Sequence, residues 1–362
     1  MKALEGLTVI AVEQAVAAPF CSARLADAGA RVVKIERPEG DFARGYDAVA
    51  QGQSSYFVWL NRGKETVTLD LSAEAGKAAL AALLEEADVL IQNLKPGALA
   101  KLGFDPAELR KANPRLITCS ISGYGTAGPM ADRKAYDLLI QAESGLCSIT
   151  GGPSEPSRVG VSVVDIATGA TAHAAILEAL IRRGITGQGA DITVSMFDVI
   201  AEWLTVPLLG HEGGQTPRRV GLAHPSIAPY GVFTTQDGAQ VLISIQSDRE
   251  WRVLARDFIG DEALGTDPEF ATNLARVENR DRTDARVGEA FARLSLQQAT
   301  GALAKANIAF ATVNDMAGLS AHPHLRRVTV DSPNGPVSFP APGAIFDGSE
   351  PEFGPVPALK PL

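Results

Sequence analysis

The first 200 residues alternate between short apolar runs and longer helical segments, and this alternation limits the possible folds more than any other feature. The run at 7–12, LTVIAV, is short, apolar and rich in β-branched residues, which is typical of a buried strand. Pro19 suits the first turn of the helix that follows, and Gly29 suits its end. Further strands are predicted at 30–36, 66–71, 88–93, 115–123 and 191–196, with a strong helix at 72–87. Because strands separated by helices form βαβ units, the sequence predicts an α/β fold with a mostly parallel sheet and helices on both faces.

The pattern changes after residue 205, and 362 residues are too many for one ordinary core. A stretch rich in Gly and Pro at 210–231 reads as a linker, and 232–246 reads as two strands around a turn. Helices are predicted at about 249–259, 283–294 and 296–306. The predicted organisation is a large domain at 1–205, a linker at 206–231, a small α+β domain at 232–325 and a C-terminal arm at 326–362. The arm contains many prolines and little regular pattern, and we expect it to pack back along the large domain.

Charge and cysteine content narrow the class of protein. A net charge of -9 argues against a nucleic-acid partner, because such proteins usually carry a basic surface. Three cysteines without CxxC spacing indicate a reducing compartment, and the acidic N-terminus does not resemble a signal peptide. The longest apolar stretch, at 163–181, is a poor membrane span because it contains Asp165, His173 and Glu178. We therefore expect a soluble cytoplasmic protein with no membrane contact. The five histidines lack partners at ligand spacing, so no metal site is predicted.

Cofactor motifs are weak in this sequence. The turn after the first strand reads EQAVAAP, without GxGxxG or a Walker motif, so a dinucleotide bound in the usual way is not expected. Basic residues do follow several predicted strands: Lys34, Arg37, Arg62, Lys64, Lys95 and Lys101. Because the carboxyl ends of parallel strands share one edge, these charges fit a polyphosphate ligand there. They also fit scattered solvated side chains, and the sequence leaves both readings open.

Asp165 stands in an otherwise apolar helical stretch and has two readings. In one, Ser162 is the N-cap residue and SVVD matches a capping box, in which the carboxylate of Asp165 accepts from the backbone N–H of Ser162. In the other reading Asp165 is functional, because a carboxylate in the first turn feels the positive end of the helix dipole and stays ionised. The same face carries Thr168, Gly169 and Ala172, which leave room for a ligand or for a closely packed helix. The local sequence does not separate these readings.

The motifs taken together resemble the family III CoA-transferases, also called the CaiB/BaiF family. The resemblance spans nearly the whole chain, through AAPFCSARLADAGARVVKIERPEGD, WLNRGKETVTLDL, ADVLIQNLKPGALAKLGF, ANPRLITCSISGYG, KAYDLLIQAESGL and VGVSVVDIATGATAHAAILEAL. It implies a Rossmann-like large domain, a small domain and an interlocked homodimer. It also implies coenzyme A and acyl-CoA as substrates rather than tightly bound cofactors, with a free carboxylic acid as the second substrate.

The resemblance places the family's catalytic aspartate on Asp165. Its carboxylate is expected to attack an acyl-CoA thioester, giving a mixed anhydride and then an aspartyl-CoA thioester that the acceptor acid takes apart. Backbone N–H groups at the helix start are expected to stabilise the oxyanions. By matching position, the resemblance implies CoA contacts at Ala15, Val16, Ala17, Arg37, Leu60, Lys64, Asn93, Leu94, Ala98, Lys101, Lys134, Tyr136 and Asp137.

Two other functions stay open at this point. The α-methylacyl-CoA racemases share the fold, but their motif has histidine where this chain has Tyr136, and a tyrosine is a poor base at neutral pH. A non-catalytic CoA- or nucleotide-binding protein is the other alternative, since Asp165 would then be only a cap. For a transferase, the resemblance of the stretch HPSIAPYGVF to other family members implies short dicarboxylic acids such as succinate, itaconate, mesaconate or citramalate, and the glycine run of some oxalate-specific members is not matched here. In that case residues His224, Ser226, Tyr230, Arg218 and Arg219 are candidates to face the acyl groups.

Overall fold

A six-stranded parallel sheet forms the centre of the large part of the chain, in a computed structural model that describes residues 2–350 and 352–359. All six strands run parallel in the order β3-β2-β1-β4-β5-β6, and the sequential order of the strands reverses between β1 and β4, as in a Rossmann-like sheet. The strands are β1 (Thr8–Val12), β2 (Arg31–Glu36), β3 (Glu65–Thr68), β4 (Val89–Gln92), β5 (Ile117–Ser122) and β6 (Asp191–Ser195). The predicted α/β class and parallel sheet are therefore confirmed.

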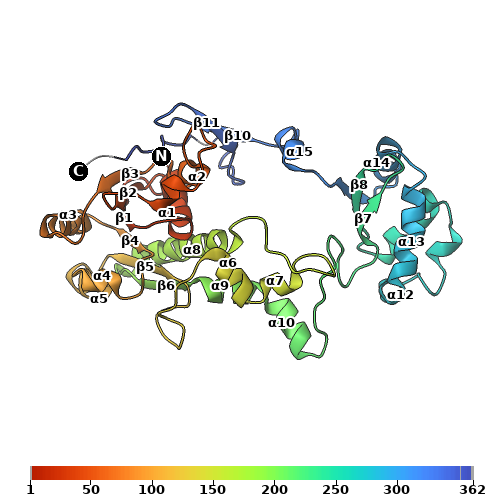
Figure 1. The fold of residues 1–362 in the computed structure, drawn as a ribbon, viewed down its shortest axis with the longest axis horizontal. Coiled ribbons are helices and arrows are strands. Elements are labelled where there is room, and N and C mark those ends of the chain that lie inside the picture. The colour runs from red at the N-terminus through yellow and green to blue at the C-terminus, as the bar shows by residue number, and fades with distance from the viewer. Residues whose placement is uncertain (1, 351, 360–362) are drawn as a thin grey trace. The chain divides into compact units, whose positions relative to one another are not determined.

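Both faces of this sheet are covered by helices (Figure 1). Along β1, Val9 and Ala11 point into one core, while Ile10 and Val12 point into the other, because side chains alternate along a strand. The first core is closed by α1 (Ala17–Asp27), α8 (Val163–Thr186) and α9 (Met196–Trp203); the second by α3 (Glu74–Glu85) and α4 (Ala98–Lys101). Each buried aliphatic side chain of this kind stabilises the fold by about 1.5–3 kcal/mol, which explains the near-continuous apolar runs in the sequence.

Helices α1 and α8 pack very closely, because the face of α8 that meets α1 carries small residues. A Cβ atom added to Gly169 would lie 2.4 Å from the Ala17 carbonyl oxygen and 2.9 Å from Phe20 Cβ. Thr168 and Ala172 on the same face are fully buried. The small face thus serves helix packing and not a ligand. By length and composition alone, α8 is long and apolar enough to cross a membrane, but its buried residues belong to this core.

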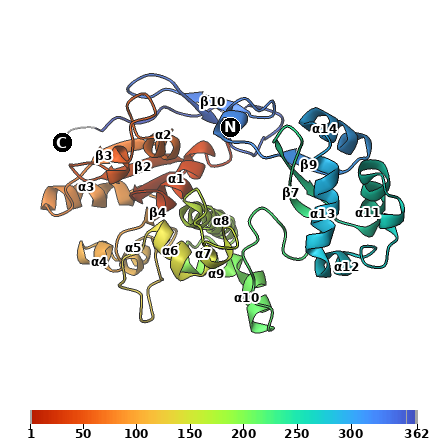
Figure 2. The same ribbon diagram turned by 45° about the vertical axis from the view of Figure 1, so that its right-hand side comes forward.

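The chain divides into two compact units. The large unit contains residues 1–147, 158–209 and 326–362, and the second contains 148–157 and 210–325. The second unit has an antiparallel sheet of β7 (Tyr230–Thr234), β8 (Gln240–Ser244) and β9 (Ala309–Thr312), with helices around it (Figure 2). Its core centres on Trp251 and Phe291, which are fully buried. Its helices are α11 (Asp248–Leu254), a π-helical turn (Ala255–Ile259), a 3-10 turn (Ala263–Gly265), α12 (Asn273–Glu278), α13 (Arg280–Phe291), α14 (Leu296–Lys305) and α15 (Met316–Ser320).

Several details differ from the sequence-based expectation. The segment predicted as a linker begins with a helix, α10 (Thr205–Glu212), and residues 148–157 group with the second unit. The C-terminal arm contains a hairpin of β10 (Arg327–Val330) and β11 (Val337–Pro340), where little regular structure was expected. The arm's residues 351 and 360–362 lie outside the described residues. The remaining elements are a 3-10 turn (Phe42–Gly45), α2 (Ser55–Asn61), α5 (Pro106–Ala112), α6 (Asp137–Glu143) and α7 (Leu146–Ile149).

Candidate active site

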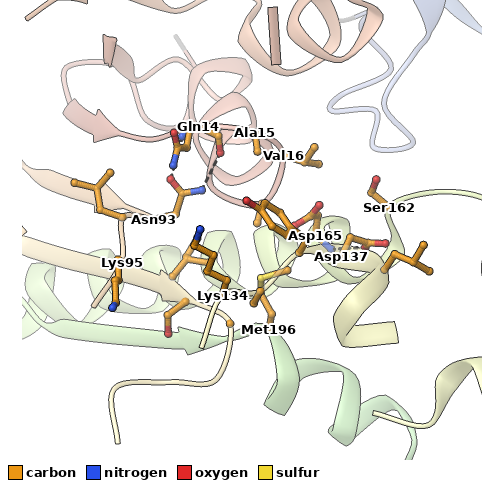
Figure 3. A pocket seen from close by; sticks show the side chains of 18 of the residues that line it. Gln14, Ala15, Val16, Asn93, Lys95, Lys134, Asp137, Ser162, Asp165 and Met196 are labelled. Carbon is orange, nitrogen blue, oxygen red and sulfur yellow. Dashed lines mark hydrogen bonds between the residues drawn. The ribbon is translucent and has the colours of Figure 1, made fainter. Parts of the chain in front are cut away.

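A cavity of about 710 Å³ lies where β1, β4 and β5 end, which is the usual ligand position in a parallel sheet of this order. One wall is the Gln14–Val16 turn between β1 and α1, and another is formed by residues that follow β4, beginning with Asn93. Asp165 lies at the start of α8 with Asp137 beside it, and Lys134 and Lys95 line the remaining side (Figure 3). Four loops and one helix start thus converge on a single space within the large unit.

Nine of the predicted site residues line this cavity: Ala15, Val16, Ala17, Asn93, Leu94, Lys134, Tyr136, Asp137 and Asp165. Arg37 lines a second cavity of about 410 Å³, which shares Gln14 and Leu94 with the first. Its Nε donates to the Gly40 carbonyl. The two cavities are therefore neighbours along one edge of the sheet.

The other predicted contacts lie elsewhere. Leu60 is fully buried and packs beneath the first turn of α1 with Val16 and Phe20. Ala98 and Lys101 lie on α4 and line neither of the two cavities.

Lys64 is an interior residue, contrary to its predicted contact with CoA. Its side chain is fully buried, and its three N–H donors go to Glu13 Oε1 at 2.7 Å, to the Pro19 carbonyl at 3.1 Å and to Asn61 Oδ1 at 3.1 Å. Burial lowers the pKa of Lys64 to about 8, although the nearby Glu13 opposes this shift. The ammonium group of Lys64 is ion-paired with Glu13, and all three of its N–H donors are used within the protein, so none is left for a phosphate.

Asp137, and not Ser162, caps the start of α8. Ser162 is the N-cap residue of α8, but its side chain makes no capping hydrogen bond, so the predicted capping box does not form. Instead, the backbone N–H groups of Val164 and Asp165 donate to Asp137 Oδ1 at 2.8 and 3.2 Å. Gln141 Nε2 donates to the other oxygen of Asp137 at 2.6 Å and fixes its orientation. Asp165 is thereby free of any capping duty.

The carboxyl of Asp165 is far less acidic than a helix start alone would make it. Burial, and after it the neighbouring charge of Asp137, together raise its pKa to about 7. The expectation that the helix dipole keeps Asp165 fully ionised is therefore wrong. Near neutral pH this carboxyl exchanges readily between its acid and carboxylate forms.

The amide donors near Asp165 belong to α1, not to α8. The first N–H groups of α8 are already used: Val163 donates to the Val161 carbonyl and Ile166 to the Ser162 carbonyl, in addition to the two held by Asp137. At the start of α1, by contrast, the backbone N–H groups of Val16 and Ala17 donate to no group among the described residues. Both residues line the cavity. A helix start with unused donors is suited to an oxyanion or anion.

Sequence reasoning missed some of the groups that line the cavity. Tyr46 lines it, and burial together with the charges of Asp41 and Asp165 raises its pKa to about 12, so it remains a neutral hydroxyl donor. Tyr56, Arg158 and Met196 line it as well. Met196 directly follows β6, so its place at the carboxyl end of a predicted strand was a signal that could have found it. Tyr46, Tyr56 and Arg158 do not directly follow a strand, and no local signal pointed to them. Among the described residues, no group of three or more His, Cys, Asp or Glu side chains is arranged to hold a metal.

The candidates from the second unit have structural partners. His224 stacks on Tyr230 with ring centres 5.3 Å apart, and Arg280 donates to the His224 carbonyl at 2.7 Å. Arg219 donates to the carbonyls of Gly152 and Ser148, both at 3.0 Å. Arg219 is therefore occupied in holding its own unit together, and a role for these residues toward acyl groups stays a prediction.

Comparison with known proteins gives the geometry its context. The model of CoA-transferase family III matches residues 4–359. The chain is 39% identical over 317 residues to acetyl-CoA:oxalate CoA-transferase from Acetobacter aceti, covering 86% of this chain and 81% of that protein. It is also 39% identical over 287 residues to succinate–glutarate CoA-transferase from Agrobacterium fabrum, covering 76% and 71%.

Solved structures agree over nearly the whole chain. A CaiB/BaiF family protein from Brucella suis has a TM-score of 0.82 at 35% identity, covering 97% of this chain and 94% of that one. Rv3272 from Mycobacterium tuberculosis has a TM-score of 0.88 at 28% identity, covering 99% and 97%. The resemblance noted in the sequence is confirmed, and the chain belongs to CoA-transferase family III.

Proposed function

We propose that the enzyme exchanges CoA between acyl-CoA and free short dicarboxylic acids, with Asp165 as the nucleophile. The observation that carries the proposal is the placement of Asp165: its carboxyl lines the main cavity, has no capping duty and titrates near neutral pH. A carboxylate that must attack a thioester needs this combination of access and basicity.

The proposed reaction begins when a carboxylate oxygen of Asp165 attacks the thioester carbonyl carbon. The carbon–sulfur bond breaks, CoA leaves as the thiolate, and a mixed anhydride remains on Asp165. The thiolate then attacks the aspartyl carbonyl, which releases the donor acid and leaves an aspartyl-CoA thioester. The acceptor carboxylate reverses both steps, so that Asp165 is regenerated and no net proton is consumed. We assign oxyanion stabilisation to the unused N–H groups of Val16 and Ala17, because those of α8 are occupied.

Charge in the cavity supports a substrate with a second carboxylate. Four cationic side chains line it, namely Lys95, Arg133, Lys134 and Arg158. The succinate–glutarate relative is named for two dicarboxylic acids, and other relatives are named for mesaconate and D-citramalate. The oxalate relative from Acetobacter aceti is equally similar to this chain, so oxalate belongs in the test although the sequence disfavoured it.

An acceptor screen tests the substrate class. Purified enzyme with succinyl-CoA is expected to form the new acyl-CoA from glutarate, mesaconate, citramalate or itaconate without ATP or metal. Formation is measured by chromatography of the CoA esters. Butyrate is the matched control, because it lacks the second carboxylate, and a value of kcat/KM at least about tenfold lower is expected for it. Equal rates with butyrate would contradict the dicarboxylate assignment, and absence of exchange with every acid would contradict the function itself.

The neighbouring charge of Asp137 gives a test of how Asp165 is tuned. Asp137→Asn keeps an oxygen for the two N–H groups of α8 but removes a negative charge beside Asp165. The pKa of Asp165 should therefore fall, and the acidic limb of the kcat/KM profile should move to lower pH by about one unit. The remote surface change Glu108→Gln is the control and should leave the limb near pH 7. A limb that stays in place in Asp137→Asn would show that Asp165 does not govern it.

We also propose that the enzyme acts as a homodimer, as the family resemblance implies. Apolar side chains on the late turns of α8 and on α9 and α10 are exposed in the single chain, among them Ile181, Ile185, Trp203 and Val206. Burial of such surface commonly drives association. A monomeric mass by light scattering would refute this part of the proposal.

A further inference from the structure

The turn that joins β1 to α1 holds a strained residue at the cavity wall. Ala15 has φ 66°, in the left-handed region that an alanine rarely adopts. Ala15 lies directly before Val16 and Ala17, so its conformation sets the direction in which their N–H groups point. Such a conformation persists only when the surrounding structure holds it.

Side chains from three other segments hold the backbone of this turn. Lys34 Nζ donates to the Glu13 carbonyl at 3.3 Å. The side chain of Asn93 makes two hydrogen bonds to the backbone of Gln14: its Oδ1 accepts from Gln14 N at 3.0 Å and its Nδ2 donates to the Gln14 carbonyl at 2.8 Å (Figure 3). Asp41 Oδ1 accepts from Ala15 N at 3.2 Å. Four successive backbone groups of the turn thus have side-chain partners.

Two of the residues that hold the turn, Lys34 and Asp41, form a buried ion pair. Lys34 Nζ lies 2.8 Å from Asp41 Oδ2, and both side chains are fully buried. Lys34 also lies 3.6 Å from Glu13 Oε1, which Lys64 neutralises at 2.7 Å. Two lysines and two carboxylates therefore balance one another beneath the turn. A hydrophobic pair of similar volume often stabilises a fold at least as well, so such a pair is poorly explained by stability alone.

We propose that the Lys34–Asp41 pair is a positioning device that holds Ala15 in its left-handed conformation and so aims the Val16 and Ala17 N–H groups into the cavity. The proposal rests on the function proposed above. Neither Lys34 nor Asp41 lines the main cavity, so both act through the turn and not by touching the reacting atoms there. Asp41 does line the neighbouring second cavity, which the experiment must take into account.

The test measures Asp41→Asn in two backgrounds. Without its charge, residue 41 holds Lys34 and Ala15 N less firmly, and the turn relaxes away from the left-handed conformation. Because Ala15, Val16 and Ala17 are also the predicted CoA contacts of this turn, the Kd for CoA by calorimetry should rise about tenfold in the natural background. The kcat for exchange should fall by a similar factor, since the Val16 and Ala17 N–H groups are assigned to the oxyanions. In the Ala15→Gly background, where the left-handed conformation carries no side-chain cost, the same change should alter both quantities less than about threefold. Equal effects in the two backgrounds would overturn the proposal, since Asp41 would then act directly or through general loosening.

Two further variants keep the test decisive. Asp27→Asn is the control: it removes an ion-paired carboxylate from the far end of α1, about 15 Å from the cavity, and should leave Kd and kcat unchanged. If Asp41→Asn does not fold, Lys34→Gln replaces it, because Lys34 is the other member of the pair and lines neither cavity, and this change should show the same dependence on Ala15→Gly. CoA binding is read separately from exchange, so failure of the proposed chemistry would leave this result interpretable.

Discussion

Asp165→Ala and Asp165→Asn are expected to reduce CoA exchange by at least about a thousandfold, because either change removes the nucleophile of both half-reactions. The loss should fall on kcat, since the contacts around the cavity that bind CoA remain. Initial rates with succinyl-CoA and the best acceptor acid provide the measurement. Glu178→Gln, an exposed change on the same helix, is the matched control and should retain full activity. Retention of more than about a tenth of the activity in Asp165→Ala would remove Asp165 from the mechanism.

Chemical trapping examines the same step without relying on rates. Hydroxylamine added with acyl-CoA should convert the activated side chain to a hydroxamate, and the mass change should map to the peptide that contains Asp165. The Asp165→Asn protein should show no such mass. A hydroxamate on any other acidic residue would assign the nucleophile there instead.

Asp165→Asn is also expected to stabilise the large unit at alkaline pH. Burial raises the pKa of Asp165 to about 7, from a reference of 3.8, so the folded chain holds this proton more tightly than the unfolded chain. Its contribution to stability is therefore fully present below pH 4, falls as the pH rises to about 7, and is lost above that value. Asparagine cannot ionise and escapes this cost.

The expected gain at pH 8 is on the order of 3 kcal/mol, reduced from the full shift because the side chain is only half-buried. At pH 4 the two proteins should unfold alike. Thermal unfolding followed at both pH values gives the measurement, with Glu178→Gln as a control that should show no pH-dependent difference. A variant less stable than the parent at pH 8 would mean that Asp165 is ionised and favourably paired in the folded protein. Such a gain would measure the stability that the natural protein gives up by keeping an ionisable carboxyl at this position.

The architecture was predictable from the sequence because it depends on local apolar runs. Strands such as β1 and β4 are buried on both faces, so their composition alone marks them. The strands that were missed lack a continuous buried apolar run. All four residues of β9 are exposed, and in β10 and β11 exposed residues alternate with more buried ones. Their pairing with distant partners, not their composition, makes them strands.

The site was predictable only where a motif carried it. Asp165 and the Gln14–Val16 turn follow from the family resemblance, and the cavity brings them together. The role of Lys64 was misjudged because its partner, Glu13, lies 51 residues away in the sequence and no local pattern links the two. Asp137 displaced the predicted capping box for the same reason, since it reaches α8 from 27 residues away. The partner of a buried charged side chain is set by the tertiary fold, and a short sequence pattern contains no information on contacts between residues far apart in the chain.

The C-terminal arm has a consequence for how the protein is made. The Pro355 carbonyl accepts from Gly63 N at 2.9 Å, and the Ala358 carbonyl accepts from Thr66 Oγ1 at 2.9 Å, beside the edge strand β3. These contacts join residues almost 300 positions apart, so they form only after the second unit has been synthesised. During synthesis, the edge of the sheet at β3 therefore stays without its C-terminal partner until about 290 further residues have been made. Nascent chains should be most exposed to chaperones and proteases during that interval.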